Sequence, residues 1–312
     1  MGHSYSIVHS HHHKHHKEDK PDQRSMGGSR VWLITGASSG FGLELAKLVA
    51  SRGDRVIATS RNPKKLSGLP EGITAARLDQ NEPLPQIQAA MNEIIKIHGT
   101  VDIVVANAGY VQTGTVEECS PEETLKQFQA NTFGPINVYR AILPHMREKR
   151  SGTLVTFGSI GAWFSMNGCN LYNASKAAVR RLSLGLGEEV KQFGIRHCLV
   201  EPGFFRTALL TPGQSRTNTG HTRFPDYAEL NKAADAAFDG YDGNQPGDPH
   251  KGASVLYDVI TSTGVAAGRE LPAFMPLGSD SVAEIKKDAQ DVIDGINAWE
   301  AIASKTDYTG GK

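Results

Sequence analysis

Short apolar runs rich in β-branched residues alternate along the chain with longer stretches whose apolar positions recur every three or four residues. Runs of four to seven residues that are apolar on both faces are typical of parallel strands covered by helices on both sides. Right-handed crossovers between such strands build a doubly wound, Rossmann-type α/β fold with a mainly parallel seven-stranded sheet. The expected strands are 31–35, 55–59, 74–78, 101–106, 153–157, 195–200 and 271–277, and the expected helices are 42–51, 84–97, 121–147, 171–193, 251–264 and 281–305.

Two segments fall outside this alternation. Residues 1–29 hold seven of the twelve histidines, which leaves two interpretations open: a metal-binding His tract, or a His-rich tag or disordered leader, and we favour the second. Residues 207–249 are rich in Gly, Pro, Asn and Asp. Because long insertions near the carboxyl ends of strands often cover a ligand, we expect a lid or substrate loop there rather than a plain surface loop. No linker divides residues 30–312, which predicts a single domain.

Composition narrows the possible functions. The 33 basic and 33 acidic residues cancel, so the chain lacks the charge excess typical of proteins that bind nucleic acids or anionic membranes. Cys119, Cys169 and Cys198 form neither a zinc-ligand spacing nor a disulfide framework, which is typical of a reducing compartment. No apolar run approaches the ~18 residues of a membrane span. We therefore expect a soluble cytoplasmic protein without a metal site.

A glycine-rich loop joins the first expected strand to the first expected helix. Gly36, Gly40 and Gly42 have the spacing GxxxGxG and follow Thr35. Glycines in this position allow a tight turn and the close approach of a pyrophosphate, whose charge is attracted by the N–H groups at the helix N-terminus. No Lys-Ser/Thr pair follows Gly42, which excludes a P-loop. The loop therefore predicts dinucleotide binding.

Further motifs follow the glycine loop in a fixed order. An Asn-Ala-Gly turn comes after the fourth expected strand, a serine follows the fifth, a YxxxK pair lies in the next helix, and a PGxxxT segment follows the sixth strand. With an asparagine in the long helix, the chain resembles the shorter branch of the short-chain dehydrogenase/reductase family over most of residues 31–207. The residues that carry the resemblance are 35–42, Asn107, Ala108, Gly109, Asn131, Ser159, Tyr172, Lys176 and 202–207.

The resemblance implies a nicotinamide dinucleotide cofactor and assigns its contacts. Asp79 is expected to accept from the adenine edge, and Thr207 to address the nicotinamide carboxamide besides capping a helix. The residues expected to bind the cofactor are Gly36, Ser38, Ser39, Gly40, Phe41, Gly42, Ser60, Arg61, Asp79, Asn107, Ala108, Gly109, Asn131, Tyr172, Lys176, Pro202, Gly203, Phe205 and Thr207.

The end of the second strand indicates which nicotinamide cofactor is bound. In NAD-binding folds, an acid about 20 residues beyond the glycines accepts the ribose hydroxyls. Residues 59–62 contain no acid, and Arg61 lies 19 residues after Gly42. A guanidinium matches a phosphate in shape and charge, and the hydroxyls of Ser38 and Ser60 add donors. We therefore expect NADP(H) rather than NAD(H).

Tyr172 and Lys176 are four residues apart in a helical pattern, so their side chains share one face. A tyrosine with a pKa near 10 is a poor acid–base catalyst at neutral pH, and a nearby ammonium is expected to lower that pKa. Lys176 is also expected to hold the nicotinamide ribose. Ser159 is expected to hydrogen-bond the substrate oxygen, on which charge develops.

Asn131 completes the expected catalytic set. Pro135, four residues later, offers no N–H to the carbonyl of Asn131, which predicts an interruption of the helix. The resemblance implies a proton relay in which this free carbonyl holds a water linked to Lys176. A kink that serves packing alone is the alternative.

Apolar and aromatic residues surround these positions. Such a cleft suits a lipophilic or aromatic carbonyl compound better than a sugar or a small acid. His197, His221 and Cys169 receive no catalytic role. The residues expected near the substrate are Ala162, Trp163, Phe164, Ser165, Met166, Cys169, Phe204, Phe205, Phe224, Tyr227 and Phe238.

The resemblance and the site residues together predict an NADPH-dependent carbonyl reductase, or the reverse alcohol dehydrogenase, with Tyr172 as general acid/base. Two alternatives stay open: an NAD-dependent alcohol dehydrogenase of the same family, and a non-catalytic NADP-binding regulatory protein. The resemblance also implies a homodimer or homotetramer that assembles through residues 121–147 and 171–193.

Overall fold

A computed structural model describes residues 29–220 and 223–310 of the chain. The expected His-rich leader, apart from residue 29, and His221 lie outside these ranges. Within them, no helix is both long and apolar enough to span a membrane.

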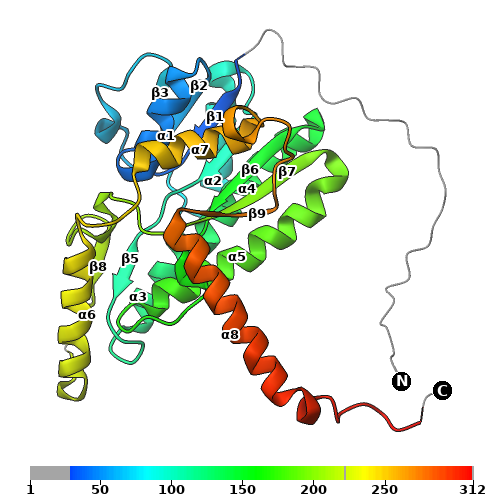
Figure 1. The fold of residues 1–312 in the computed structure, drawn as a ribbon. Coiled ribbons are helices and arrows are strands. Elements are labelled where there is room, and N and C mark those ends of the chain that lie inside the picture. The colour runs from blue at the N-terminus through cyan, green and yellow to red at the C-terminus, as the bar shows by residue number, and fades with distance from the viewer. Residues whose placement is uncertain (1–28, 221–222, 311–312) are drawn as a thin grey trace.

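Seven strands form one central sheet in the order β3-β2-β1-β4-β6-β7-β9 (Figure 1). Every neighbouring pair is parallel, and the strand order reverses between β1 and β4. The doubly wound sheet predicted from the sequence is thereby confirmed. The strands are β1 (Val31–Ile34), β2 (Arg55–Ser60), β3 (Ile73–Arg77), β4 (Ile103–Ala106), β6 (Gly152–Phe157), β7 (Ile195–Pro202) and β9 (Phe274–Leu277).

Helices cover both faces of the sheet, which explains why the strands are apolar on both sides. In β1, Trp32 and Ile34 belong to the core beneath α1 and α7, whereas Val31 and Leu33 belong to the core beneath α2 and α4. The covering helices are α1 (Gly40–Ser51) and α7 (Pro249–Thr261) on one face, and α2 (Leu84–His98), α4 (Gly134–Lys149) and α5 (Asn170–Val190) on the other. The last helix, α8 (Ser279–Ala303), extends away from the sheet (Figure 1).

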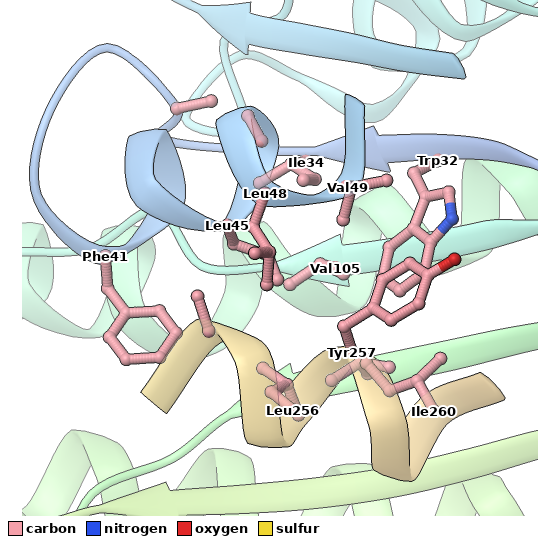
Figure 2. Packing of buried hydrophobic residues seen from close by; sticks show 14 of the residues in the cluster. Trp32, Ile34, Phe41, Leu45, Leu48, Val49, Val105, Leu256, Tyr257 and Ile260 are labelled. Carbon is pink, nitrogen blue, oxygen red and sulfur yellow. The ribbon is translucent and has the colours of Figure 1, made fainter. Parts of the chain in front are cut away.

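The core between β1, α1 and α7 fixes the start of α1. Trp32 stacks on Tyr257 of α7 with ring centroids 5.6 Å apart (Figure 2). Asp54 accepts from the Trp32 indole at 3.0 Å and from the Tyr257 hydroxyl at 3.1 Å, so both buried donors are satisfied. Phe41 and Leu45 of α1 pack in the same core. This packing holds the start of α1, and with it the end of the loop that precedes α1, in a fixed position.

The long helix expected at 121–147 is helical but changes its winding in the middle. It comprises α3 (Pro121–Phe128), a π-helical segment (Gln129–Phe133) and α4. The N–H of Gly134 donates to the carbonyl of Gln129, five residues earlier. Because Pro135 has no N–H, the normal α-helical ladder cannot continue here. The predicted interruption is confirmed, and it takes the form of a π turn.

The segment 207–249 contains more regular structure than its composition indicated. Its strand β8 (Arg216–Asn218) pairs with β5 (Val111–Thr113) in a separate two-stranded sheet, and it also contains α6 (Ala228–Tyr241). Neither strand nor α6 was expected. The alanines of α6 favour a helix and were a usable signal, whereas three-residue strands exist only through their pairing.

Contacts across the molecule hold this segment in place. The carboxylate of Glu118, which is 4% exposed, accepts from the Asn231 amide at 3.0 Å, from the Thr115 hydroxyl at 2.8 Å and from the Phe224 N–H at 2.7 Å. Arg216 is buried and pairs with Asp239 at 2.6 Å. The segment is thus fastened to the chain that follows β4.

A chain of buried hydrogen bonds crosses from α4 to β7. The Thr156 hydroxyl bonds to the Tyr139 hydroxyl at 2.7 Å and to Nε2 of His197 at 2.9 Å. Burial lowers the pKa of His197 from 6.5 to about 4. His197 is therefore a neutral core residue, consistent with its lack of a catalytic role.

We expect His197→Gln to flatten the pH dependence of the free energy of unfolding. Between pH 6.5 and about pH 4, His197 is protonated in the unfolded chain but neutral in the folded chain. The wild type should therefore lose up to about 3 kcal/mol as the pH falls through this window, a loss that the variant escapes. Urea unfolding at successive pH values measures this. The exposed His250→Gln serves as the control, and parallel profiles for His197→Gln and wild type would contradict the expectation.

Candidate active site

The residues singled out by the sequence meet in one cleft of about 1030 Å³ at the carboxyl ends of the parallel strands. The cleft lies where the strand order reverses, the position at which open α/β sheets bind ligands. Its size suits a dinucleotide beside a small molecule, since pockets for drug-sized ligands are about 300–1,000 Å³. Every predicted catalytic or cofactor-binding residue lines it except Gly42 and Asn131.

The glycine loop packs tightly against the turn after β4. Gly36 has a φ of +61°, and a Cβ there would lie 2.7 Å from the Cα of Ala108. A Cβ on Gly42 would lie 2.7 Å from the carbonyl oxygen of Gly36 and would clash with the Asn107 amide. That amide donates to the carbonyls of Thr35 and Gly36 at 3.2 Å each. Gly42 therefore shapes the loop from behind the cleft.

Helix α1 begins at Gly40, two residues earlier than expected. Ser39 is its N-cap but makes no side-chain capping hydrogen bond, so this cap does not occupy the first-turn N–H groups, which are of the kind that bind anions. Phe41 lies 8% exposed, and its ring packs against Phe157 at 5.2 Å and Phe205 at 5.3 Å. Its backbone, rather than its ring, is the part suited to a cofactor.

The residues after β2 and β3 form one end of the cleft. Ser60, Arg61 and Asp79 all line it, and Arg61 is exposed. Lys65, in the 3₁₀ segment Pro63–Leu66, lines it as well. Sequence reasoning missed Lys65, although a second basic residue one turn beyond Arg61 was a usable signal.

Asn131 lies in the π segment and grips the turn after β4. Its amide donates to the Tyr110 carbonyl at 3.0 Å and to the Ser175 hydroxyl at 3.2 Å, and its oxygen accepts from the Tyr110 N–H at 3.1 Å. With 1% exposure, the side chain holds the turn against α5 and does not line the cleft. The water relay through its carbonyl stays a prediction.

Tyr172, Ser159 and Lys176 converge inside the cleft. The Tyr172 hydroxyl hydrogen-bonds to Ser159, whose Oγ also accepts from the Gly161 N–H at 3.0 Å. Lys176 is 6% exposed, and its Nζ donates to the Phe157 carbonyl at 3.0 Å. The same Nζ lies 5.9 Å from the centre of the Tyr172 ring.

The low pKa expected for Tyr172 beside Lys176 is not found, and the pKa lies above its usual value. Burial raises the pKa of Tyr172 to about 12, and the opposing contribution comes from the hydrogen bond to Ser159. Burial also lowers the pKa of Lys176 to about 8, a change that the negative charge of Glu201 opposes. At neutral pH the site therefore holds a protonated phenol beside a mostly charged amine. The thiol of Cys169, whose pKa burial raises to about 12, is neutral and suited to packing.

The segment after β7 turns sharply at Pro202 and Gly203. The carboxylate of Asp280 fills the space that a Cβ on Gly203 would need, and it accepts from the Phe204 N–H at 2.8 Å. The Thr207 hydroxyl accepts from the Leu209 N–H at 3.3 Å and caps a short 3₁₀ helix, as expected. Sequence reasoning missed Asp280 because it is distant in the chain and belongs to no motif.

Apolar side chains also line the cleft, beside polar ones such as Gln214, Ser215 and Gln245. The apolar residues include Phe164, Met166, Cys169, Phe204, Phe205, Leu209, Leu210 and Phe238, so residues 207–217 and α6 do border the site. The expectation was wrong for Ala162, Trp163, Ser165, Phe224 and Tyr227, which do not line it. The Trp163 indole instead donates to Glu201 at 2.9 Å, and the Tyr227 hydroxyl points to Glu117.

Comparison with known proteins places this site in a family. A family model described as short chain dehydrogenase matches residues 30–218. The oxidoreductase BOA17 of Botryotinia fuckeliana is 35% identical over 184 residues, which cover 57% of this chain and 67% of the relative. A 3-ketodihydrosphingosine reductase of Bacteroides thetaiotaomicron is 35% identical over 200 residues, which cover 64% and 72% of the two chains.

A crystal structure gives the same result for the fold. A short-chain dehydrogenase from Streptomyces avermitilis superimposes with a TM-score of 0.79 at 35% identity, covering 90% of this chain and 100% of the other. The family model matches more than half of the chain. The chain therefore belongs to the short-chain dehydrogenase/reductase family of NAD(P)-dependent oxidoreductases.

Proposed function

We propose that the protein reduces ketones or aldehydes with NADPH, or oxidises the corresponding alcohols in the reverse direction. The observation that carries this proposal is the protonated Tyr172, hydrogen-bonded to Ser159 beside the buried Lys176. A phenol with a pKa of about 12 keeps its proton at neutral pH and can give it to an oxygen that becomes basic as a carbonyl is reduced. The protonated phenol is the form that reduction of a carbonyl requires.

Each catalytic side chain then has a defined task. When bound, a reduced nicotinamide would supply the hydride for the carbonyl carbon. The Ser159 hydroxyl donates a hydrogen bond to the carbonyl oxygen and orients it, and Tyr172 transfers its proton to the same oxygen. A C–H and an O–H bond form while the C=O π bond breaks, which yields the alcohol. Lys176 stabilises the tyrosinate left behind until a proton returns from solvent, for which the Asn131 carbonyl is the proposed path.

The geometry of the glycine loop supports binding of a dinucleotide. The end of the cleft after β2 supports binding of NADP(H) rather than NAD(H). A pyrophosphate can approach the glycine loop closely because the loop carries no side chain there and α1 presents its first-turn N–H groups. Arg61 and Lys65 both line the end of the cleft after β2. These two cations, and the absence of an acid from residues 59–62, favour the binding of a 2′-phosphate.

The apolar side chains of the cleft support a lipophilic or aromatic substrate. These phenylalanine, leucine and methionine side chains offer little to hydrogen-bond a sugar. A cytoplasmic location and a homodimer or homotetramer built on α3–α4 and α5 stay predictions from the sequence; the exposure of Leu125, Phe133 and Leu182 on these elements supports the assembly.

We expect Gly42→Ala to weaken NADPH binding at least tenfold, because the new methyl would displace the Asn107 amide or the Gly36 carbonyl. Isothermal titration calorimetry measures the affinity. Gly185→Ala is the matched control: no atom lies within 4 Å of its Cβ position on α5, so binding should be unchanged. Equal affinities for Gly42→Ala and wild type would argue against the close packing of the two loops.

We expect Tyr172→Phe to lower kcat for carbonyl reduction about a hundredfold or more, since the proton donor is lost. NADPH oxidation over a panel of aromatic and aliphatic ketones, followed by absorbance, measures turnover. The affinity for NADPH should fall far less than kcat, which separates chemistry from binding. No turnover of any ketone by the wild type, or full activity of the variant, would refute the proposed reaction.

We expect Arg61→Asp to weaken NADPH binding tenfold or more and to leave NADH binding equal or tighter, because a carboxylate repels the 2′-phosphate. Lys64→Asp makes the same change of charge three residues away, outside the cleft, and should leave the preference intact. Titration of each protein with both cofactors decides. A wild-type preference for NADH would overturn the assignment.

A further inference from the structure

Glu201 is a fully buried carboxylate that the mechanism above does not use. It stands next to the last residue of β7 and is 0% exposed. Its Oε1 accepts from the Trp163 indole at 2.9 Å and from Arg180, whereas its Oε2 is buried with no hydrogen-bond partner among the described residues. A bare carboxylate oxygen is costly in the interior, so its presence points to a positive charge close by.

The Glu201 side chain packs against Gly158, which follows β6 and precedes Ser159. A Cβ on Gly158 would lie 3.0 Å from the Cγ of Glu201, so only glycine leaves room for the carboxylate stem. Gly158 stands between Phe157, whose carbonyl accepts from Lys176 Nζ at 3.0 Å, and Ser159. Glu201 therefore lies against the short piece of backbone that holds Lys176.

Helix α5 carries two cations on the face that includes the partner of this carboxylate. Tyr172, Lys176 and Arg180 follow one another at intervals of four, so they share one face of the helix. Arg180 pairs with Oε1 of Glu201, and its guanidinium stacks over the rings of Trp163 at 4.4 Å and Phe274 at 5.0 Å. Arg180 thus fixes one carboxylate oxygen, and the next cation toward the phenol is Lys176.

The surroundings of Lys176 contain no other acid that raises its pKa among the described residues. Burial lowers the pKa of Lys176 to about 8, and Glu201 is the group whose charge opposes this change. Burial raises the pKa of Glu201, and the hydrogen bond from Trp163 and the charges of Arg180 and Lys176 oppose this change. The polar and titratable groups around Lys176 are Tyr172 and Arg180 of α5, the Phe157 carbonyl and Ser159 at the end of β6, Asn131 of the π segment, and Glu201 of β7.

We propose that Glu201 is a positioning residue of the active site, whose buried carboxylate supplies the counter-charge that keeps the Lys176 ammonium protonated beside Tyr172. The consequence for catalysis rests on the proposed function. The electrostatic coupling between Glu201 and Lys176 is a property of the folded chain and can be measured without a substrate.

The direct test is the pKa of Lys176 in the full chain with isotope-labelled lysine, followed by NMR and assigned by the signal lost in Lys176→Arg. In Glu201→Gln, the pKa of Lys176 should fall by about one, a tenfold change in the acid dissociation constant. Glu201→Asp keeps the charge but withdraws it by one methylene, so it should give a smaller fall. If Glu201→Gln does not fold, the smaller fall in the pKa of Lys176 in Glu201→Asp decides the test.

Glu201→Asp is the matched control, because it disturbs the packing and the pair with Arg180 but keeps a carboxylate. A merely structural role for the pair predicts the same change in the pKa of Lys176 for Glu201→Gln and Glu201→Asp. Counter-charge predicts a full fall in Glu201→Gln and a smaller fall in Glu201→Asp.

Turnover provides the second readout. Reduction should decline as the pH rises through the pKa of Lys176, since the ammonium is lost, and the midpoint should move to lower pH in Glu201→Gln by the amount seen by NMR. A uniform loss of kcat without a shift of midpoint would overturn the proposal, as would an unchanged pKa of Lys176 in Glu201→Gln or an equal fall in Glu201→Asp. If no carbonyl is reduced at all, the proposed function fails while the NMR result still decides the coupling.

Discussion

Thr35 and Asn107 lock together the loops that follow β1 and β4. The Thr35 hydroxyl accepts from the N–H groups of Asn107 and Ala108 at 3.0 and 3.1 Å, and the Asn107 amide returns hydrogen bonds to the first loop. The two backbones meet at Gly36, where no side chain would fit. Because the chain crosses to opposite faces of the sheet from these two strands, their locked loops form the floor of the cleft.

Buried charge is the second constraint on the site. Lys176 and Glu201 are almost completely removed from water, and each shifts the pKa of the other toward its charged form. An interior of low dielectric makes such pairing strong and makes an unpaired partner costly. The same burial keeps the Tyr172 phenol protonated, so the protonation state of the site is set by its exclusion of solvent more than by any single neighbour.

The motif spacing predicted the catalytic side of the site better than the substrate side. Tyr172, Lys176 and Ser159 were found because helix periodicity and strand ends bring them together through local geometry. Trp163 was assigned to the substrate cleft from its position next to Ser159, yet its indole turns to Glu201, a partner on another strand. Asp280 and Lys65 had no motif around them, and Asn131 was placed correctly in the helix while the targets of its side chain stayed unknown.

The sequence by itself determined the strands, the covering helices and their order, because apolar periodicity follows from which faces are buried. It also determined the dinucleotide loop, because glycine spacing reflects backbone conformations that other residues cannot adopt. Only the tertiary structure decided the pairing of β5 with β8, the attachment of residues 207–249 through Glu118, and the high pKa of Tyr172. Each of these depends on groups distant in the chain and on solvent exclusion, neither of which leaves a local pattern.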